Sequence, residues 1–337
     1  MPIQPTLAVR IREDQRRGRG GASRLRPKRG TEIVAGTDYP TTWEGFIGQT
    51  SAVEQLKAST SSALHRNERL DHILLASGAH GIGKTTLAQI IAIQLGTGFI
   101  SVSGALNVDD ARSIIGSMQD GDVLFWDEFH LAVTGNKSRA DWLLPMLTDH
   151  VLLTKQGTEP MPDITVIAAT TDVGKLPQTI ISRFMIRPRL DYYTDTEGVL
   201  ICKNLSERMQ VRIVGNENAF SRMATAASNN PRTMRQILTA VRDIAISQKR
   251  VDLEKAFEWA GVTHDGLSNE CVDMLMVLVA SPNFTASLET IQASLGEPGP
   301  LRHHEQTLIQ KGFIQITGRG RQLTDAGVRR ASELIMP

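Results

Sequence analysis

The chain has 337 residues, of which 41% are hydrophobic and 22% are charged. This composition excludes a wholly disordered, collagen-like or coiled-coil protein, and the length predicts two or three domains of about 150 residues each. No apolar run approaches the ~20 residues that cross a bilayer, so we expect no membrane partner. Because the only cysteines are Cys202 and Cys271, a disulfide framework or a four-cysteine zinc site is excluded, and a cytoplasmic location fits best.

The net charge of +1 conceals a gradient along the chain. Residues 1–40 carry nine basic and four acidic side chains, and residues 301–337 carry six basic and three acidic ones. The net charge between them, over 41–300, is therefore −7. This asymmetry indicates that the two ends of the chain, rather than its middle, face a polyanion such as DNA.

Residues 1–38 are rich in Arg and Gly, contain few large apolar residues and show no sustained period. We interpret them as a disordered basic arm, with an inert tail as the alternative.

Short apolar runs then alternate with helical segments over residues 39–193. Buried parallel strands are predicted over 73–75, 99–102, 123–126 and 165–169, with helices that include 86–95 and 108–118. Strands that alternate with helices predict an α/β domain built on a parallel sheet.

The rest of the chain is predicted to be mainly helical. Thr194 and Glu197 form a capping box that opens a helix to about residue 208. Further helices are expected over 218–228, 231–248 and 252–260, which gives a small helical domain over 194–262. After a linker (261–266), helices over 269–280, 287–295 and 301–311 precede a hairpin, 313–316 and 321–323, whose turn is Gly318-Arg319-Gly320. Three helices and a Gly-rich hairpin predict a winged helix over 263–337.

A phosphate loop is predicted at residues 78–85, Gly-Ala-His-Gly-Ile-Gly-Lys-Thr, which fit G-x-x-x-x-G-K-[ST] between a predicted strand and a helix. The glycines allow backbone N–H groups to surround the phosphates of ATP. Lys84 is expected to reach the β- and γ-phosphates, and the Thr85 hydroxyl is expected to bind Mg²⁺. The predicted nucleotide contacts of the loop are Gly81, Gly83, Lys84, Thr85 and Thr86.

Two carboxylates, Asp127 and Glu128, follow the third predicted strand. Adjacent acids at the end of a buried strand are costly unless they bind something. We expect Asp127 to hold Mg²⁺ and Glu128 to polarise the water that attacks the γ-phosphate, with a simple helix cap as the alternative. His80 and His130 lie nearby in the sequence, but neither has a metal-ligand partner at helical spacing or a nearby Cys. His80 is therefore expected to be a loop side chain, and His130 to pack or to form a hydrogen bond at the start of a helix.

These motifs, with others in the same order, resemble the RuvB family of AAA+ ATPases, the motors of bacterial Holliday-junction branch migration. The resemblance covers about residues 40–330 and rests on 70–75 (Leu-Asp-His-Ile-Leu-Leu), 83–88, 123–130, 46–49, 169–171, 182–184, 192–194, 231–232, 311–313 and 318–321. It implies a large AAA+ domain, a small helical lid and a C-terminal winged helix.

The resemblance also implies roles for single residues. Ile47 and Gly48, with Tyr193, would flank the adenine. Thr171 would be the polar sensor that contacts the γ-phosphate or the attacking water; a cap at the strand end is the alternative.

Arg183 would be the arginine finger inserted into the neighbouring subunit's site, and Arg232 the lid arginine that reports nucleotide state; surface ion pairs are the alternative for both. A finger implies a homo-oligomeric ring, a hexamer in the family. In the wing, Arg319 and Arg321 would contact the phosphates of duplex or four-way-junction DNA, with a solvated charged turn as the alternative.

Three departures from the family pattern stand out. Ala79-His80 replaces two prolines in the phosphate loop, and Ile316 replaces a basic residue that contacts DNA. The segment between Asp149 and Ile164 is shorter than the hairpin that docks RuvA, with Gln156-Gly157 as its remaining turn, which weakens the case for a RuvA-type partner.

The expected function is that of an ATP-hydrolysing DNA motor that drives branch migration of Holliday junctions in recombination and repair. A non-motor AAA+ loader or remodelling ATPase, acting on a replication or recombination protein, is the alternative. A winged-helix transcription regulator, with 301–311 as its recognition helix, is a third possibility.

Overall fold

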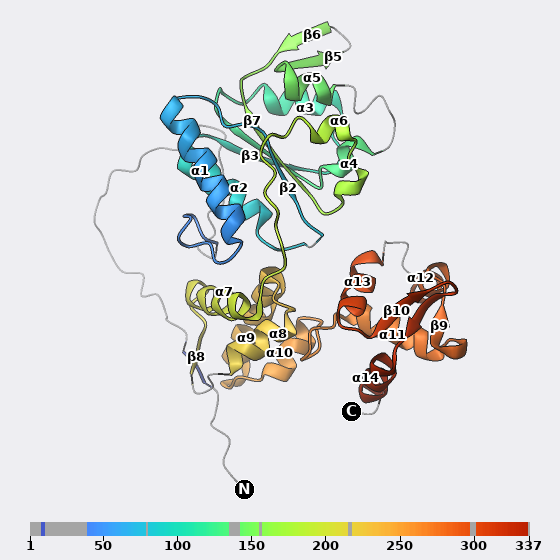
Figure 1. Cartoon of the computed structure of the whole chain (residues 1–337). Coiled ribbons are helices and arrows are strands. Elements are labelled where there is room, and N and C mark those ends of the chain that lie inside the picture. Colours follow the sequence, from blue (N-terminus) through green and yellow to red (C-terminus); the bar gives the residue numbers. More distant parts are fainter. Residues whose placement is uncertain are drawn as a thin grey trace. The chain divides into compact units, whose positions relative to one another are not determined.

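The computed structural model describes residues 8–10 and 39–337, apart from 79, 135–141, 155–156, 215–217, 297–300 and 336–337. The chain divides into two compact units (Figure 1). We call Arg12–Gln210 the P-loop unit, and Met1–Ile11 together with Val211–Pro337 the C-terminal unit.

The P-loop unit contains the predicted parallel sheet, in the order β2-β7-β4-β3. Its strands are β2 (Ile73–Ala76), β3 (Phe99–Ser103), β4 (Val123–Asp127) and β7 (Thr165–Thr170), which confirms the four predicted strands. The register pairs Leu74 with Ala168 and Leu124 with Val166. A separate antiparallel hairpin is formed by β5 (Val151–Thr154) and β6 (Gly157–Pro160). The sequence had predicted only the turn of this hairpin.

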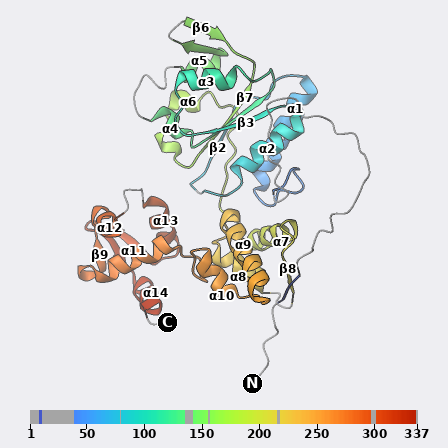
Figure 2. The ribbon, with the colours of Figure 1, turned by 180° about the vertical axis from the view of Figure 1, so that it is seen from behind.

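Helices cover both faces of the sheet, because side chains of a strand alternate between its two faces. The helices of the P-loop unit, not all of which lie on the sheet, are α1 (Thr50–Arg66), α2 (Lys84–Leu95), α3 (Val108–Ile115), α4 (His130–Val133), α5 (Leu143–Thr148), α6 (Gln178–Ile181) and α7 (Asp195–Arg208). Leu124 and Trp126 pack with residues of α3 and α5 in one buried cluster. Helices α1 and α2 lie on the opposite face, as the two views in Figures 1 and 2 show.

The end of β4 is fixed by aromatic packing. Trp126 is fully buried, lies edge-on to Phe129 at 5.2 Å between ring centroids and stacks on Trp142 at 6.0 Å. Its indole N–H donates to the carbonyl oxygen of Gly104 (2.8 Å), so burial leaves no polar atom of this side chain unpaired. The two carboxylates that follow Trp126 therefore start from a rigid position.

His72, in the motif that precedes β2, is a structural residue. Its side chain is buried, and Nδ1 accepts a hydrogen bond from the backbone N–H of Val166 (3.0 Å). Burial, with the charges of Arg69 and His150 nearby, lowers the pKa of His72 to about 3, so the ring is neutral and able to accept.

The C-terminal unit begins with the helical lid, α8 (Ala219–Ala226), α9 (Pro231–Gln248) and α10 (Leu253–Trp259), as predicted. The winged helix follows, with α11 (Asn269–Ala280), α12 (Leu288–Leu295), α13 (Arg302–Gln310) and α14 (Asp325–Ile335). Its sheet has the order β10-β11-β9, from β9 (Thr285–Ala286), β10 (Ile314–Thr317) and β11 (Gly320–Leu323). The winged helix and its hairpin are confirmed; α14 and β9 were not predicted.

Two parts of the predicted domain plan differ in the structure. Helix α7, expected in the lid, belongs to the P-loop unit, because Arg208 donates to the carbonyl oxygen of Tyr39 (2.9 Å) and Glu197 lies against Gly48. In the arm, which was predicted to be disordered, Ala8–Arg10 form strand β1. This strand pairs antiparallel with β8 (Arg212–Val214) because the exposed backbone of a strand edge binds another strand. The remainder of the arm lies outside the described residues.

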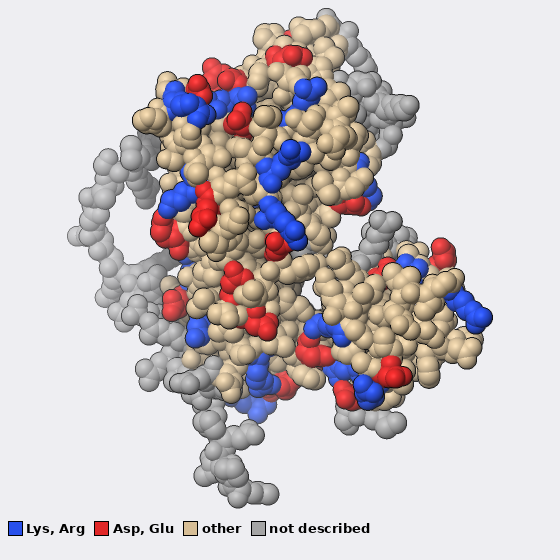
Figure 3. All heavy atoms as spheres, viewed as in Figure 1, with Lys and Arg blue, Asp and Glu red and all other residues tan. Residues whose placement is uncertain are grey.

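Charge is distributed evenly over the face shown in Figure 3. Lys and Arg side chains are interspersed with Asp and Glu on both units, and the described residues of this face form no large patch of one charge. None of the described helices is long and apolar enough to cross a membrane.

Candidate nucleotide-binding site

The predicted phosphate loop lies between β2 and the start of α2. Gly81 and Gly83 have φ values of 72° and 98°, a region that glycine adopts without strain. A Cβ atom on Gly83 would lie 2.8 Å from Cζ of Phe46, so the loop backbone approaches this ring too closely for any larger residue. The backbone therefore requires glycine at position 83, as the motif predicts, and Gly81, at a variable position of the motif, adopts a conformation that favours glycine.

Lys84 and Thr85 occupy the first turn of α2. The Lys84 side chain is buried, and Nζ donates to Oγ of Ser77 (3.1 Å), whereas Thr85 is exposed. The first turn of α2 carries no acidic residue. The positive end of the helix therefore faces no competing carboxylate of its own, which favours a phosphate there.

The residues expected to flank the adenine lie beside this loop. The Tyr193 hydroxyl donates to the carbonyl oxygen of Ile82 (2.8 Å), and burial raises the pKa of Tyr193, which keeps the phenol protonated. Gly48 has φ 76°, and a Cβ there would lie 2.8 Å from the Tyr193 ring. Ile47 adjoins Gly48 and is half-buried. The structure thus brings Ile47, Gly48 and Tyr193 together with the phosphate loop.

The two carboxylates follow in sequence at the end of β4. The backbone N–H of Glu128 donates to Oδ1 of Asp127 (3.0 Å), and Gly104 N–H donates to the Asp127 carbonyl oxygen (3.0 Å). Glu128 has φ 48°, a left-handed conformation that is uncommon outside glycine and is concentrated at functional sites. This turn places the Glu128 carboxylate next to residues from three other segments.

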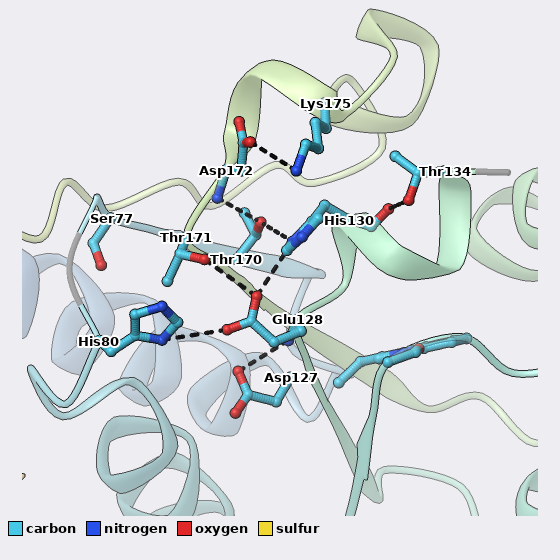
Figure 4. Close-up of polar contacts among 12 residues, drawn as sticks. Ser77, His80, Asp127, Glu128, His130, Thr134, Thr170, Thr171, Asp172 and Lys175 are labelled. Carbon is cyan, nitrogen blue, oxygen red and sulfur yellow. Dashed lines mark hydrogen bonds and ion pairs between the residues drawn. The ribbon is translucent and has the colours of Figure 1, made fainter. Parts of the chain in front are cut away.

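Figure 4 shows the partners of the Glu128 carboxylate. Oε2 accepts from the Thr171 hydroxyl (3.2 Å) and lies 3.3 Å from Nδ1 of His130. Oε1 lies 3.5 Å from Nδ1 of His80. His130 Nδ1 is also 3.1 Å from the hydroxyl of Thr170, at the end of β7. Neither histidine was predicted as a partner of Glu128, since their spacing carries no metal-ligand signal and only the folded chain joins these segments.

The donor set fits Mg²⁺ held by a bound nucleotide. Among the described residues there is no cluster of three or more His, Cys, Asp or Glu that could hold a metal ion. Mg²⁺ in such sites takes few protein ligands and is otherwise held by water and phosphate oxygens. The exposed hydroxyl of Thr85 and the half-buried carboxylate of Asp127 match that requirement.

The other four predicted site residues belong to other elements of the chain. Arg183 follows α6 and is exposed, and Arg232 begins α9 in the C-terminal unit, where its N–H donates to Oδ1 of Asn230 (2.9 Å). Arg319 is exposed at the tip of the wing. Arg321 is different: its Nε donates to Oε1 of Glu305 (2.8 Å), whose side chain is only 8% exposed. This guanidinium therefore neutralises a buried carboxylate, and a contact of Arg321 with DNA stays a prediction.

Comparison with known proteins identifies similar chains. The family model for the Holliday junction DNA helicase RuvB P-loop domain matches residues 39–190, and that for the RuvB C-terminal winged helix domain matches residues 264–331. The Holliday junction branch migration complex subunit RuvB of Kosmotoga olearia is 33% identical over 320 residues, 89% of this chain and 91% of that protein.

Solved structures give the same result. The Thermotoga maritima RuvB Holliday junction branch migration motor is 30% identical with a TM-score of 0.75, and a point mutant of it reaches 0.76 at the same identity. Each match covers 88% of this chain and 98% of the other. The similarity thus extends over both units.

Proposed function

This chain belongs to the RuvB family of Holliday junction DNA helicases, and from that premise we propose that it is an ATP-hydrolysing motor that drives branch migration of four-way DNA junctions. The observation that carries the proposal is the placement of Glu128. Its carboxylate lies at the end of β4 between Thr171 and the phosphate loop, where the γ-phosphate of a nucleotide would be bound.

Each residue of the site has one task in this proposal. Lys84 and the N–H groups of the loop hold the β- and γ-phosphates. Glu128 orients a water molecule and accepts its proton as the water attacks the γ-phosphorus, and ADP leaves with the electron pair of the broken bond. Thr171, which donates to Glu128, keeps the carboxylate and the water in register.

Mg²⁺ would be held by the Thr85 hydroxyl and, through water, by Asp127. When bound it neutralises the charge that develops on the phosphate oxygens.

The proposed assembly is a homo-oligomeric ring, with a hexamer as the family's precedent. The exposed Arg183 enters the site of a neighbouring copy, because a guanidinium stabilises the charge of the transferred phosphoryl group. Arg232 reports the nucleotide state from the lid. Arg319, at the wing tip, contacts DNA phosphates without reading the sequence.

A partner of the RuvA type would dock on the hairpin β5–β6. Each of its strands has four residues, and Leu153 on β5 is 40% exposed.

A second candidate function is that of a non-motor AAA+ loader. Two features favour it: the hairpin β5–β6 is short, and Ile316 on β10 is exposed.

Variants of the site test the proposed chemistry. Lys84→Ala removes the charge that binds the phosphates, so nucleotide binding should be lost. Glu128→Gln removes only the proton acceptor, so this variant should bind ATP and hydrolyse it at least ~100-fold more slowly. Both are checked by nucleotide binding and by phosphate release. Turnover by Glu128→Gln at the wild-type rate would contradict the assignment.

A branch-migration assay on a synthetic four-way junction, with and without a RuvA protein, tests the motor. A motor requires ATPase activity that duplex or junction DNA stimulates, with a steep loss of stimulation as salt rises. ATP hydrolysis without any stimulation by DNA at low salt would instead favour the loader.

A further inference from the structure

We propose that His80 is a positioning residue for Glu128, which holds one oxygen of its carboxylate from within the phosphate loop. The inference rests on the proposed role of Glu128 in ATP hydrolysis. It adds a residue that the phosphate-loop motif leaves unspecified, since His80 occupies one of the four variable positions of that motif.

The Glu128 carboxylate is held at both of its oxygens (Figure 4). Thr171 and His130 approach Oε2, at 3.2 Å and 3.3 Å. His80 alone is placed at Oε1 among the described residues, at 3.5 Å. A carboxylate restrained at one oxygen still rotates about its terminal torsion, which is broad, whereas restraint at both oxygens fixes its plane. His80 therefore controls an orientation that Thr171 and His130 leave open.

The partners of Glu128 come from separate elements. Thr171 follows strand β7, and His130 begins α4, the helix that comes after strand β4. His80 belongs to the loop that surrounds the phosphates. A phosphate that fills the loop therefore also sets the position of the imidazole, and with it the orientation of the carboxylate that activates water.

The exposure of the side chains agrees with this difference between His130, which begins a helix, and His80, which lies in the loop. The His130 side chain is 9% exposed and that of Glu128 is 23% exposed, whereas His80 is 49% exposed. A contact with so much solvent adds little to stability, because exposed ion pairs contribute only about 0–1 kcal/mol. The contact between His80 and Glu128 matters for the position of the carboxylate, because small misplacements of a reacting group lower a rate by large factors.

His80→Ala is the first test, measured as steady-state ATP hydrolysis by the full chain. We expect kcat to fall about 3- to 10-fold while KM for ATP stays within about twofold, since the lost contact is to Glu128 and not to the nucleotide. His80→Asn should recover most of the loss, because its amide N–H lies near the position of the imidazole Nδ1 and can donate to Oε1. His65→Ala, at an exposed histidine of α1, is the matched control and should leave kcat unchanged.

A second measurement separates positioning from direct contact with ATP. In the Glu128→Gln background, His80→Ala should leave the affinity for ATP unchanged. If His80→Ala lowers the ATP affinity of Glu128→Gln by the same factor by which it lowers kcat of the wild type, His80 contacts the nucleotide itself. That result would overturn the proposal. An unchanged kcat in His80→Ala would overturn it as well. Neither result affects the proposed ATPase, which fails only if the wild-type chain does not hydrolyse ATP.

Discussion

At the scale of single residues, the two arginines of the wing have different surroundings. Arg321 is 21% exposed and pairs with Glu305, which lies on α13 beneath the hairpin. Arg319 is exposed in the turn, and its backbone N–H donates to the Thr317 hydroxyl (3.3 Å). A buried carboxylate that loses its partner is costly, so we infer that Arg321 stabilises the wing and that Arg319 is left to contact DNA.

We predict that Arg321→Ala lowers the free energy of unfolding by about 1–3 kcal/mol, the usual cost of leaving a buried polar group unpaired. Arg319→Ala should leave stability unchanged, weaken DNA binding and reduce its salt dependence by about one ion. Denaturant unfolding and DNA titrations at several salt concentrations measure these effects. A stable Arg321→Ala protein that has lost DNA binding would instead support the predicted contact of Arg321 with DNA.

The site shows which residues a sequence can predict. The phosphate loop and the Asp127-Glu128 pair are local motifs, so their chemistry follows from adjacent residues and from the strand before each. The contacts of His80 and His130 with Glu128 join three segments, and the Arg321–Glu305 pair joins a helix to a strand. Contacts of this kind depend on packing, and one sequence carries no signal for them.

At the scale of elements, helix α7 begins at the predicted capping box. Thr194 Oγ1 accepts from the Glu197 N–H (3.3 Å), and the Glu197 carboxylate accepts from the Thr194 N–H (2.9 Å). The residue before the cap is Tyr193, whose hydroxyl contacts the phosphate loop. The cap therefore fixes the direction in which the chain leaves the nucleotide site.

Removal of this cap should weaken the helix and the site together. Thr194→Ala is expected to cost about 1 kcal/mol of unfolding free energy, and a smaller part of this should appear as weaker ATP binding. Thr194→Ser keeps the hydroxyl and is the matched control. Thermal unfolding with and without nucleotide measures both effects, and equal stability of the Ala and Ser variants would show that the cap contributes nothing.

The four strands of the sheet were predicted from short segments that contain several apolar residues, and all four were found. Helix α1 was missed because its buried face consists of Ala52, Leu56, Thr60 and Ala63, which give a weak apolar period. Helix α14 was also missed; the residues that it buries, Gly327 and Ala331, are small. A Cβ on Gly327 would lie 2.0 Å from the Phe313 carbonyl oxygen, a close approach that only the folded chain makes visible.

At the scale of the whole molecule, the proposed role of Arg183 requires an assembly of several copies. Arg183 lies in the turn after α6 and is exposed. In the extended segment that follows, beside β2, Phe184, Ile186 and Leu190 are buried, whereas Arg187 and Arg189 are exposed. Arg183 thus points away from the core of its own unit, as a residue that enters a neighbour's site must do.

We predict that Arg183→Ala binds ATP but loses ATPase activity by a factor on the order of 10³. A mixture with Glu128→Gln should regain activity above the sum of the two proteins, because each Glu128→Gln subunit supplies an intact arginine to an intact site. Phosphate release across mixing ratios measures this effect, with Arg187→Ala as the exposed control. An Arg183→Ala protein whose activity the mixture does not restore would contradict a finger that acts between subunits.

The segment predicted as a linker has a mechanical consequence. Its backbone closes on itself, with Thr263 N–H donating to the Leu267 carbonyl oxygen (2.8 Å), and Ser228 of the lid donates to the Gly266 carbonyl oxygen (3.0 Å). From the winged helix, Arg330 binds the Asp265 carboxylate (2.8 Å), and Lys311 donates to the Asp265 carbonyl oxygen (2.6 Å). A segment that is hydrogen-bonded to both of its neighbours couples them more closely than a free linker does. We therefore expect a movement of the lid to be passed on to the winged helix through this segment.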